Sequence, residues 1–224
     1  MKPIRIIKSQ WYKYRFKKTH KLTNNWFLND YFNEQQKIEI KKMRDPVRYG
    51  TILLAKEQIE EEKIEGDFAE CGVYRGATST FLVKHFPDRQ LFLFDTFQGF
   101  DLKDSDSLND NRFKDTSVEG VLKRIGNTSN VVVKQGYFPE TAAGLEDKRF
   151  AFVMIDFDKY EPTLAALKFF YPRVVQGGFI FVHDYNNPES NKACSRAFKE
   201  FAQTISEKII AIPDSWGTAF IRKI

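Results

Sequence analysis

The sequence predicts an α/β protein with a doubly wound, seven-stranded, mostly parallel sheet whose last strand is antiparallel. Apolar segments of strand length alternate with helical segments along the chain, which is the pattern of βαβ units. Segments 90–94 and 152–155 are almost wholly apolar, as in strands covered on both faces. A turn at 213–217 separates segments 209–212 and 218–223, which predicts a hairpin and therefore an antiparallel final strand.

Local signals predict each further element. Pro46 stands near the start of a segment with apolar residues at helical spacing, including Ile52 and Ile59. Thr116 and Glu119 have the spacing of a capping box and predict the start of a helix. The complete set expected, in order, is helix 46–63, strand 68–71, helix 77–85, strand 90–94, loop 98–115, helix 116–125, strand 130–134, strand 152–155, helix 161–173, a turn at Gly177-Gly178, strand 179–182, helix 190–206, strand 209–212 and strand 218–223.

Positive charge gathers in the first part of the chain. The net charge is +5, but residues 1–29 hold eight of the 35 lysines and arginines and no acid, which leaves 27 basic and 30 acidic side chains in the rest. A chain-wide affinity for nucleic acid is therefore not expected. We expect residues 1–45 to form a basic, aromatic extension and residues 46–224 to form one domain. Two interpretations of the extension stay open: contact with anionic lipid or an acidic partner, or packing on its own domain or on a second subunit of a homo-oligomer.

Other features of the composition bound the location. The sequence has no run of about 18 apolar residues, so no membrane span is expected. The N-terminus lacks the apolar stretch of a secretory signal. Two cysteines, Cys71 and Cys194, are too few for a disulfide framework. These observations predict a protein of the reducing cytoplasm.

A glycine-containing loop follows the first expected strand. Residues 70–76 run Glu-Cys-Gly-Val-Tyr-Arg-Gly, the pattern E-x-G-x-x-x-G. Gly72 permits a sharp turn and a close approach of the backbone to a ligand, and Gly76 allows the next helix to pack against the strand. The acid Glu70 suits a ligand with a positive group, and S-adenosylmethionine has an ammonium and a sulfonium. The alternative is a glycine turn with a structural role alone.

Two segments further along the chain fit an adenosine ligand. Asp95 ends the second strand, where an acid accepts hydrogen bonds from ribose hydroxyls, and NAD would need that acid as well. Gly136, Tyr137 and Phe138 follow the third strand and either form an aromatic wall for adenine or pack in the core. The absence of the G-x-G-x-x-G pattern argues against NAD.

Acidic residues follow two other strands directly. Asp156 and Asp158 end one strand, and His183 and Asp184 end the next. A helix joins the two strands, so they are parallel and their carboxyl ends meet at one edge. Carboxylates gathered there repel one another unless a proton or a cation such as Mg²⁺ or Mn²⁺ offsets the charge. The alternative is structural, with Asp158 capping the next helix and His183 bonding to a backbone carbonyl.

Together these motifs resemble the macrocin O-methyltransferase family. The resemblance covers residues 46–222, and its most specific part is the D-x-D-x-Y-E-x-T run that begins at Asp156, with the later pairs Gly177-Gly178 and Asp184-Tyr185. Stretches 70–76 and 94–100 add to it. The resemblance implies a Rossmann-like class I methyltransferase that uses S-adenosylmethionine to methylate sugar hydroxyls on macrolide or aminocoumarin antibiotics.

Carried onto this sequence, the resemblance implies that Asp158 is the general base and that Asp156 and Asp184 are metal ligands. Family members usually have two consecutive aspartates before the tyrosine. Here the first is His183, whose imidazole suits Mn²⁺, Fe²⁺ or Zn²⁺ better than Mg²⁺. The expected cofactor-binding residues are Glu70, Cys71, Gly72, Val73, Tyr74, Gly76, Asp95, Thr96, Phe97, Gly136, Tyr137, Phe138 and Asp156.

The leading hypothesis is an S-adenosylmethionine-dependent O-methyltransferase that acts on a hydroxyl of a sugar or glycosylated small molecule with the assistance of a divalent cation. The sulfonium methyl is already electrophilic, so the protein needs only to position it and to deprotonate the acceptor. Loop 98–115 would close over the site. The alternatives are an NAD-dependent oxidoreductase and a catalytically silent or regulatory binding protein on the same fold. A nucleic-acid substrate is disfavoured because the acids of the site repel phosphates.

Overall fold

The computed structural model describes residues 31–104 and 110–224. The basic segment 1–29 therefore lies outside the described residues, as do residues 105–109 of loop 98–115, which is called the acidic loop below. The chain divides into two compact units, Met1–Leu54 and Ala55–Ile224. In the described ranges, every helix is too short or too polar to cross a bilayer.

The described part of the first unit is helical. Helix α2 (Glu34–Lys42) begins at Asn33, whose side chain accepts a hydrogen bond from the backbone N–H of Gln36, while the Gln36 side chain accepts one from the Asn33 N–H. This reciprocal capping box satisfies two N–H groups that a helix start leaves open. Helix α3 (Pro46–Glu61) begins with a proline, as predicted, and continues into the second unit.

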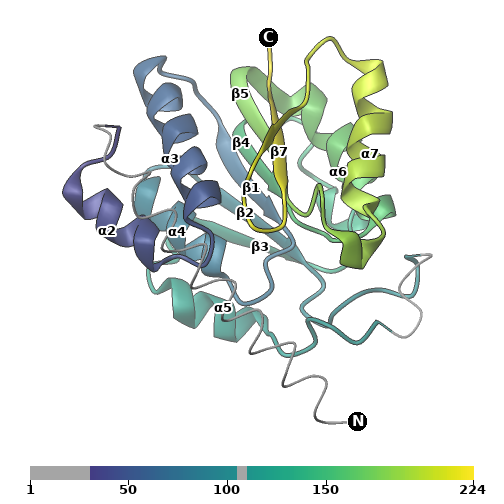
Figure 1. Cartoon of the computed structure of the whole chain (residues 1–224). Coiled ribbons are helices and arrows are strands. Elements are labelled where there is room, and N and C mark those ends of the chain that lie inside the picture. The colour runs from purple at the N-terminus through teal and green to yellow at the C-terminus, as the bar shows by residue number, and fades with distance from the viewer. Residues whose placement is uncertain (1–30, 105–109) are drawn as a thin grey trace. The chain divides into compact units, whose positions relative to one another are not determined.

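The second unit is built on a seven-stranded sheet in the order β3-β2-β1-β4-β5-β7-β6 (Figure 1). Its strands are β1 (Asp67–Cys71), β2 (Leu91–Asp95), β3 (Val131–Gln135), β4 (Phe150–Ile155), β5 (Val174–Val182), β6 (Ile210–Ile212) and β7 (Thr218–Arg222). Strands β1 to β5 are parallel, and β7 runs antiparallel to both β5 and β6. The predicted fold class, with its antiparallel last strand, is confirmed.

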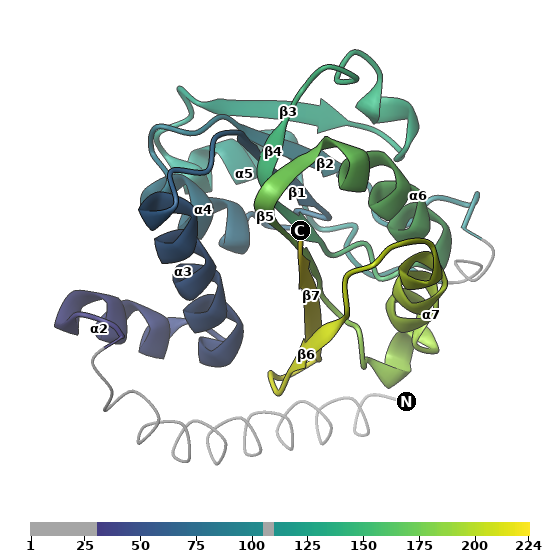
Figure 2. The same cartoon turned by 90° about the horizontal axis from the view of Figure 1, so that it is seen from above.

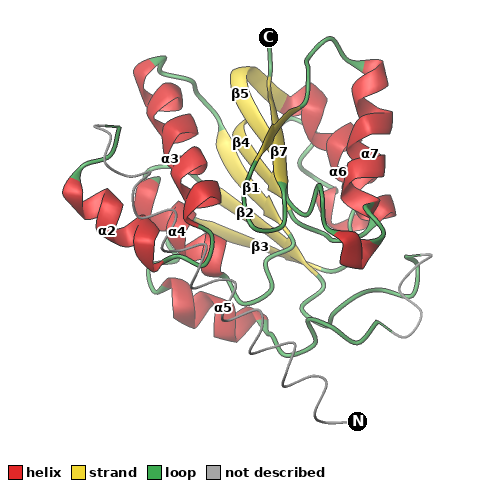
Figure 3. Ribbon diagram, in the orientation of Figure 1, coloured by secondary structure: helices red, strands yellow, loops and turns green. Residues whose placement is uncertain are grey.

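Helices cover both faces of this sheet (Figures 2 and 3). Helices α4 (Ala77–His85) and α5 (Val118–Ile125) lie on one face, and α6 (Tyr160–Phe170) and α7 (Ala193–Phe201) lie on the other. Because both faces are covered, every residue of the central strand β4 is buried. The uninterrupted apolar sequence of that strand is explained by this position.

Phenylalanine fills the space between the sheet and α6. Phe94, Phe138, Phe150 and Phe170 are each at most 2% exposed. Four pairs among them have ring centroids 5.0 to 5.8 Å apart, and three of the four pairs meet edge to face, an arrangement that the ring quadrupoles favour. Through Phe138 this aromatic cluster fixes the chain that leaves β3.

Two predicted helices are shorter than expected. Helix α6 ends at Phe170, and Tyr171–Arg173 form a 3₁₀ turn, η2, because Pro172 has no N–H to continue the α-helical ladder. The helix predicted over 190–206 is α7 alone. It stands between the 3₁₀ turns η3 (Pro188–Ser190) and η4 (Ala202–Thr204).

Two other local predictions were wrong. Gly177 and Gly178 do not form a turn but lie inside β5, where the register against β4 shifts. Helix α5 is capped by Ser117, whose side chain accepts a hydrogen bond from an N–H of the first turn, and not by Thr116. The Thr116 hydroxyl instead donates to the Tyr74 carbonyl. The sequence pattern assigned the Thr116 hydroxyl to the helix start, but this hydroxyl bonds to a residue far away in the sequence.

Gly72 lets the end of β1 touch the chain that leaves β4. Its φ is +88°, and a Cβ at this position would overlap the backbone carbonyl of Asp156. The Asp156 N–H donates to the Cys71 carbonyl at 2.7 Å, which holds the two backbones in contact. Only glycine permits both the positive φ and the close approach.

Gly72→Ala is expected to lower the free energy of unfolding by more than about 3 kcal/mol, because the new Cβ forces the two backbones apart. Gly144→Ala is a matched control, since Gly144 has a φ of +81° but no atom within 4 Å of the new Cβ. It carries backbone strain alone, worth about 1–2 kcal/mol. Urea denaturation followed by circular dichroism measures both variants. Equal losses would show that the contact with Asp156 does not limit position 72.

Candidate functional site

Four segments bring chemically active side chains to one edge of the sheet. The glycine loop 72–76 follows β1, Asp95 ends β2, Asp156 follows β4, and His183 follows β5. Their strands are parallel, so their carboxyl ends lie at the same rim, where ligands bind in open α/β sheets.

Asp156, His183 and Asp184 lie together at this rim. The Nδ1 atom of His183 is 2.9 Å from Oδ1 of Asp156 and 3.4 Å from Oδ1 of Asp184. One ligand-capable atom from each of the three residues falls within 4.8 Å of the others. His183 therefore bonds to a carboxylate, whereas the structural alternative required a backbone carbonyl.

Asp158 belongs to the same cluster but is more deeply buried than Asp156. It is 7% exposed and shares a hydrogen bond with Asp184. Burial raises the pKa of the Asp158 carboxyl well above its usual value, and the hydrogen bond and charge of Asp184 raise it further. Asp158 does not cap α6, because the N-cap residue is Lys159.

The donor set of the rim fits a divalent cation. Ligands at right angles around an ion, with bonds of about 2.1 Å, lie about 3 Å apart. The two separations measured from the His183 Nδ1 atom, 2.9 and 3.4 Å, are close to that value. Two carboxylates supply the oxygen ligands that hard cations prefer, and the imidazole adds a nitrogen. A cation would also reduce the repulsion among Asp156, Asp158 and Asp184.

Asp95 holds the glycine loop in place. Its Oδ2 atom accepts hydrogen bonds from the backbone N–H groups of Val73 and Tyr74 at 2.7 and 2.9 Å, and its Oδ1 atom accepts one from Phe97 at 2.7 Å. A carboxylate has about four acceptor positions, so one remains for a ligand hydroxyl. The hydroxyl of Thr96 is used within its own turn, where it donates to a carbonyl three residues further on at 2.5 Å.

Two of the predicted cofactor residues point into the interior. Glu70 is 2% exposed and accepts a hydrogen bond from the Ser79 hydroxyl of α4 at 2.5 Å. Cys71 is fully buried in the core, and burial raises the pKa of its thiol well above the usual value. The Glu70 carboxylate thus supports the start of α4. Its role toward a positive ligand group stays a prediction. Side chains alternate along a strand, and both faces here are covered.

The three residues after β3 have different roles. The N–H of Gly136 donates to the Asp95 carbonyl at 2.9 Å. Phe138 lies in the aromatic core, so the packing interpretation fits it better than a wall for adenine. The Tyr137 hydroxyl donates to Oδ1 of Asp104 at 2.7 Å and ties the acidic loop to this segment. Burial raises the pKa of Asp104 to about 6.

Ion pairs of Asp110 with Arg112 and Lys159 hold the second part of the acidic loop. The Arg112 guanidinium donates to both oxygens of the Asp110 carboxylate, from Nε at 2.9 Å and from Nη2 at 2.8 Å, and the buried ammonium of Lys159 lies 3.2 Å from the same carboxylate. Hydrogen bonds from Arg112 and then Lys159 lower the pKa of Asp110 to about 2. Both cations also lie over the Phe100 ring, at 5.3 and 4.2 Å from its centroid. Because Lys159 directly follows Asp158, the loop is attached to the acidic rim.

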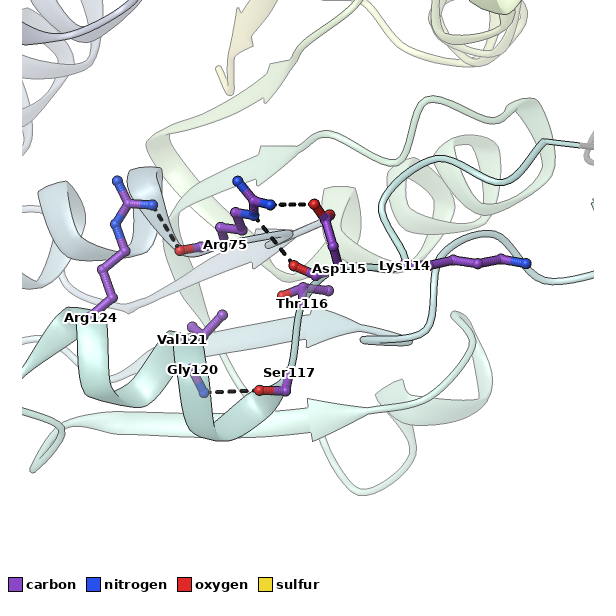
Figure 4. Close-up of a pocket in the computed structure, with 8 residues that line it drawn as sticks. All are labelled: Arg75, Lys114, Asp115, Thr116, Ser117, Gly120, Val121 and Arg124. Carbon is purple, nitrogen blue, oxygen red and sulfur yellow. Dashed lines mark hydrogen bonds and ion pairs between the residues drawn. The ribbon is translucent and has the colours of Figure 1, made fainter.

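The loop ends against the glycine loop. Arg75 pairs with Asp115, and Arg124 donates to the Arg75 carbonyl at 3.1 Å. A surface hollow of about 490 Å³ opens beside this junction (Figure 4). It is lined by Arg75, Lys114, Asp115, Thr116, Ser117, Gly120, Val121 and Arg124. Its two arginines are already bonded, and none of the rim acids lines it.

The profile of the macrocin-O-methyltransferase (TylF) family matches residues 42–223. The chain belongs to this family. The expected resemblance is thereby confirmed over the whole range for which it was predicted, 46–222.

Two curated relatives illustrate the family. Mycinamicin III 3''-O-methyltransferase of Micromonospora griseorubida is 29% identical over 171 residues, and 8-demethyl-8-(2,3-dimethoxy-alpha-L-rhamnosyl)-tetracenomycin-C 4'-O-methyltransferase of Streptomyces olivaceus is 30% identical over 156 residues. The matches cover 66% and 62% of this chain. They span 66% and 60% of the relatives' own lengths, which is less than two thirds of each.

Solved structures share the fold of this family member. The O-methyltransferase NovP is 23% identical, with a TM-score of 0.67 over 80% of both chains. CalS11, a calicheamicin methyltransferase, is 20% identical, with a TM-score of 0.63 over 92% of this chain and 91% of the other. At these identities the likeness concerns the arrangement of the chain.

Two cations of the site were not predicted from this family member's sequence. Lys159 follows Asp158, and a lysine so close to the end of a wholly apolar strand is a usable signal for a buried ion pair. Arg112 and Asp110 gave no such signal, because they lie 47 to 49 residues away from Lys159 in a loop without periodicity. Their role depends on how the loop folds back.

Asp104→Asn is expected to stabilise the protein above pH 6. The pKa of Asp104 is raised from 3.8 to about 6 in the folded chain, so its contribution to stability is present at low pH and is lost as the pH rises through 6. Asparagine keeps an acceptor for the Tyr137 hydroxyl and carries no charge. Urea unfolding at pH 7.5 should show a gain of about 2 kcal/mol. An equal gain at pH 4 would contradict an origin in ionisation.

Proposed function

We propose that this protein is an S-adenosylmethionine-dependent O-methyltransferase that methylates a hydroxyl of a sugar or glycosylated small molecule. The observation that carries the proposal is the position of Asp158 beside Asp156, His183 and Asp184, at the rim that also holds the glycine loop. A proton acceptor and a group of hydroxyl-binding ligands thus stand next to a cofactor loop. Family membership supports the class of reaction, as do the names of the curated relatives.

The cofactor would lie along the carboxyl ends of β1, β2 and β3. The remaining acceptor position of Asp95 suits a ribose hydroxyl, and Gly72 permits close approach of the backbone. Tyr74 and Phe97 both donate backbone hydrogen bonds to the Asp95 carboxylate, and both have positive φ values, 49° and 55°. The buried residues Glu70 and Cys71 would contribute through their backbone and not through their side chains.

Asp158 is the general base of this proposal. The acceptor oxygen attacks the sulfonium methyl, the S–CH₃ bond breaks, S-adenosylhomocysteine leaves, and the hydroxyl proton passes to the Asp158 carboxylate. Burial raises the pKa of this carboxyl, which makes its ionised form a stronger base than an exposed aspartate. The buried position also limits competition from water.

Asp156, His183 and Asp184 would hold a divalent cation, with Mg²⁺ or Mn²⁺ as the candidates. When bound, such a cation lowers the pKa of an acceptor hydroxyl and fixes its orientation. These residues hold two carboxylates and an imidazole in a fixed group beside the base. They would also position the acceptor relative to the methyl group.

The acidic loop would cover the acceptor. The ion pairs of Asp110 with Arg112 and Lys159 hold the second part of the loop against the rim, and the bond from Tyr137 to Asp104 holds the first part. A covered site excludes water and strengthens the electrostatic interactions inside it. No observation in the described residues favours an NAD-dependent oxidoreductase or a silent binding protein over methyl transfer.

Asp158→Asn is expected to lower kcat for methyl transfer by about 10²–10⁴-fold, because an amide cannot accept the acceptor proton. Binding of S-adenosylhomocysteine, measured by calorimetry, should stay nearly unchanged. Transfer of a labelled methyl group to a panel of glycosides and nucleotide-linked deoxysugars measures turnover. Asp147→Asn, at an exposed position before β4, is the control and should keep full activity. Near-normal turnover of the Asp158 variant would remove Asp158 as the base.

Chelation is expected to abolish methyl transfer, and Mn²⁺ or Mg²⁺ should restore it, because the hydroxyl would no longer be acidified at the rim. The same labelled-methyl assay in EDTA, before and after addition of each metal, measures this effect. Cofactor binding in EDTA serves as the control and should persist. Full turnover in EDTA would show that the rim works without a metal.

A further inference from the structure

The two nitrogens of the His183 ring have different surroundings. The residue is 5% exposed at the end of β5. Its Nδ1 atom faces the carboxylates of Asp156 and Asp184. Its Nε2 atom is buried, and no hydrogen-bond partner for it exists within residues 31–104 and 110–224. A buried nitrogen of this kind needs an explanation, since such groups are normally paired.

Asp214 lies beside this ring. It belongs to the turn between β6 and β7, where its carboxylate accepts hydrogen bonds from the backbone N–H of Thr218 at 2.6 Å and from the Thr218 hydroxyl. A carboxylate oxygen of Asp214 and a ring nitrogen of His183 lie within 4.8 Å of each other. Nδ1 faces Asp156 and Asp184, and Nε2 has no hydrogen-bond partner among the described residues, so Nε2 is the ring nitrogen with the capacity to bond to Asp214. One water molecule or a small rotation bridges such a separation.

We propose that His183 is a metal ligand through Nδ1, that Asp214 is the positioning residue which holds its Nε2–H, and that this chain therefore prefers Mn²⁺, Fe²⁺ or Co²⁺ to Mg²⁺. The inference rests on the proposed function in that it concerns the same rim. It adds an outer carboxylate and a class of metal.

The tautomer of His183 links the two halves of the proposal. A ring nitrogen binds a cation only without its proton, so ligation through Nδ1 places the single proton of neutral imidazole on Nε2. A buried N–H without an acceptor costs about 1–3 kcal/mol. Histidine ligands accordingly donate their second nitrogen to a carboxylate, a carbonyl or water. Asp214 supplies a carboxylate for this purpose, and Thr218 fixes its orientation.

The donor set decides which metals bind well. Mg²⁺ demands nearly ideal octahedral oxygen coordination and gains little from imidazole, whereas the later divalent metals bind nitrogen more strongly. An imidazole in place of a carboxylate also removes one negative charge from the set formed by Asp156 and Asp184. Both changes weaken the attraction for a hard cation more than for Mn²⁺, Fe²⁺ or Co²⁺.

Metal binding to the full chain tests the inference without reference to turnover. The signal of free Mn²⁺ in electron paramagnetic resonance gives the Mn²⁺ affinity, competition gives the Mg²⁺ affinity, and the pulsed spectrum of bound Mn²⁺ reports coupling to a ligand nitrogen. We expect the wild-type chain to show this coupling. His183→Asp should lose it and should lower the ratio of Mn²⁺ to Mg²⁺ affinity about tenfold or more.

Asp214→Asn should weaken Mn²⁺ binding about 10–100-fold while the nitrogen coupling is retained. Asp214→Glu keeps a carboxylate and should recover part of the affinity, which a purely structural role in the β6–β7 turn would not predict. Asp147→Asn is the control and should bind Mn²⁺ as the wild type does. Thermal unfolding of each metal-free variant identifies any that has lost its fold.

Bound Mn²⁺ without nitrogen coupling, or no Mn²⁺ binding at all, would overturn the assignment of His183. An unchanged Mn²⁺ affinity in Asp214→Asn would overturn the role of Asp214. Failure of the proposed function gives a different result. If the chain shows nitrogen-coupled Mn²⁺ but methylates no sugar acceptor, the metal inference stands and the proposed function is wrong. If the chain methylates sugars in EDTA and binds no Mn²⁺, the proposed function stands and the metal inference is wrong.

Discussion

Backbone contact between the end of β1 and the chain that leaves β4 is the constraint on which the rest of the site depends. The Asp156 N–H donates to the Cys71 carbonyl, and Gly72 has no Cβ to hold the two chains apart. The loop proposed to bind the cofactor and the acids proposed to bind the acceptor therefore leave the sheet side by side, directly after the paired residues Cys71 and Ile155. A methyl donor and a hydroxyl held at these two positions would be neighbours without any movement of the sheet.

Charge compensation at the rim links the acids to the loop that covers them. Lys159 is 2% exposed, and an isolated ammonium at that depth would cost several kcal/mol. Asp110 and the Phe100 ring offset this cost, and both belong to the acidic loop. The contacts that offset the cost of burying the Lys159 ammonium thus also hold the loop in place. Loss of the loop from this position would remove both of these contacts from a buried cation.

Much of the fold and the position of the site could be predicted because they follow from local signals and strand direction. Parallel strands that end in acids must bring those acids to one edge, whatever the rest of the chain does. Errors arose where a distant partner decided the outcome. The Thr116 hydroxyl bonds to Tyr74, 42 residues away along the chain, and does not cap α5. The end of α6 was an avoidable error, since Pro172 marks it in the sequence.

His183 shows how far the sequence alone can be taken. The departure from two consecutive aspartates is visible in the sequence, and the chemistry of imidazole suggests a change of metal. The second nitrogen cannot be assigned in the same way, because Asp214, the carboxylate proposed to hold it, lies in the distant β6–β7 turn. That hairpin is the element that distinguishes this sheet from a wholly parallel one. On this argument, the antiparallel end of the sheet contributes to the site as well as to the fold, since it carries the carboxylate that would fix the tautomer of a ligand.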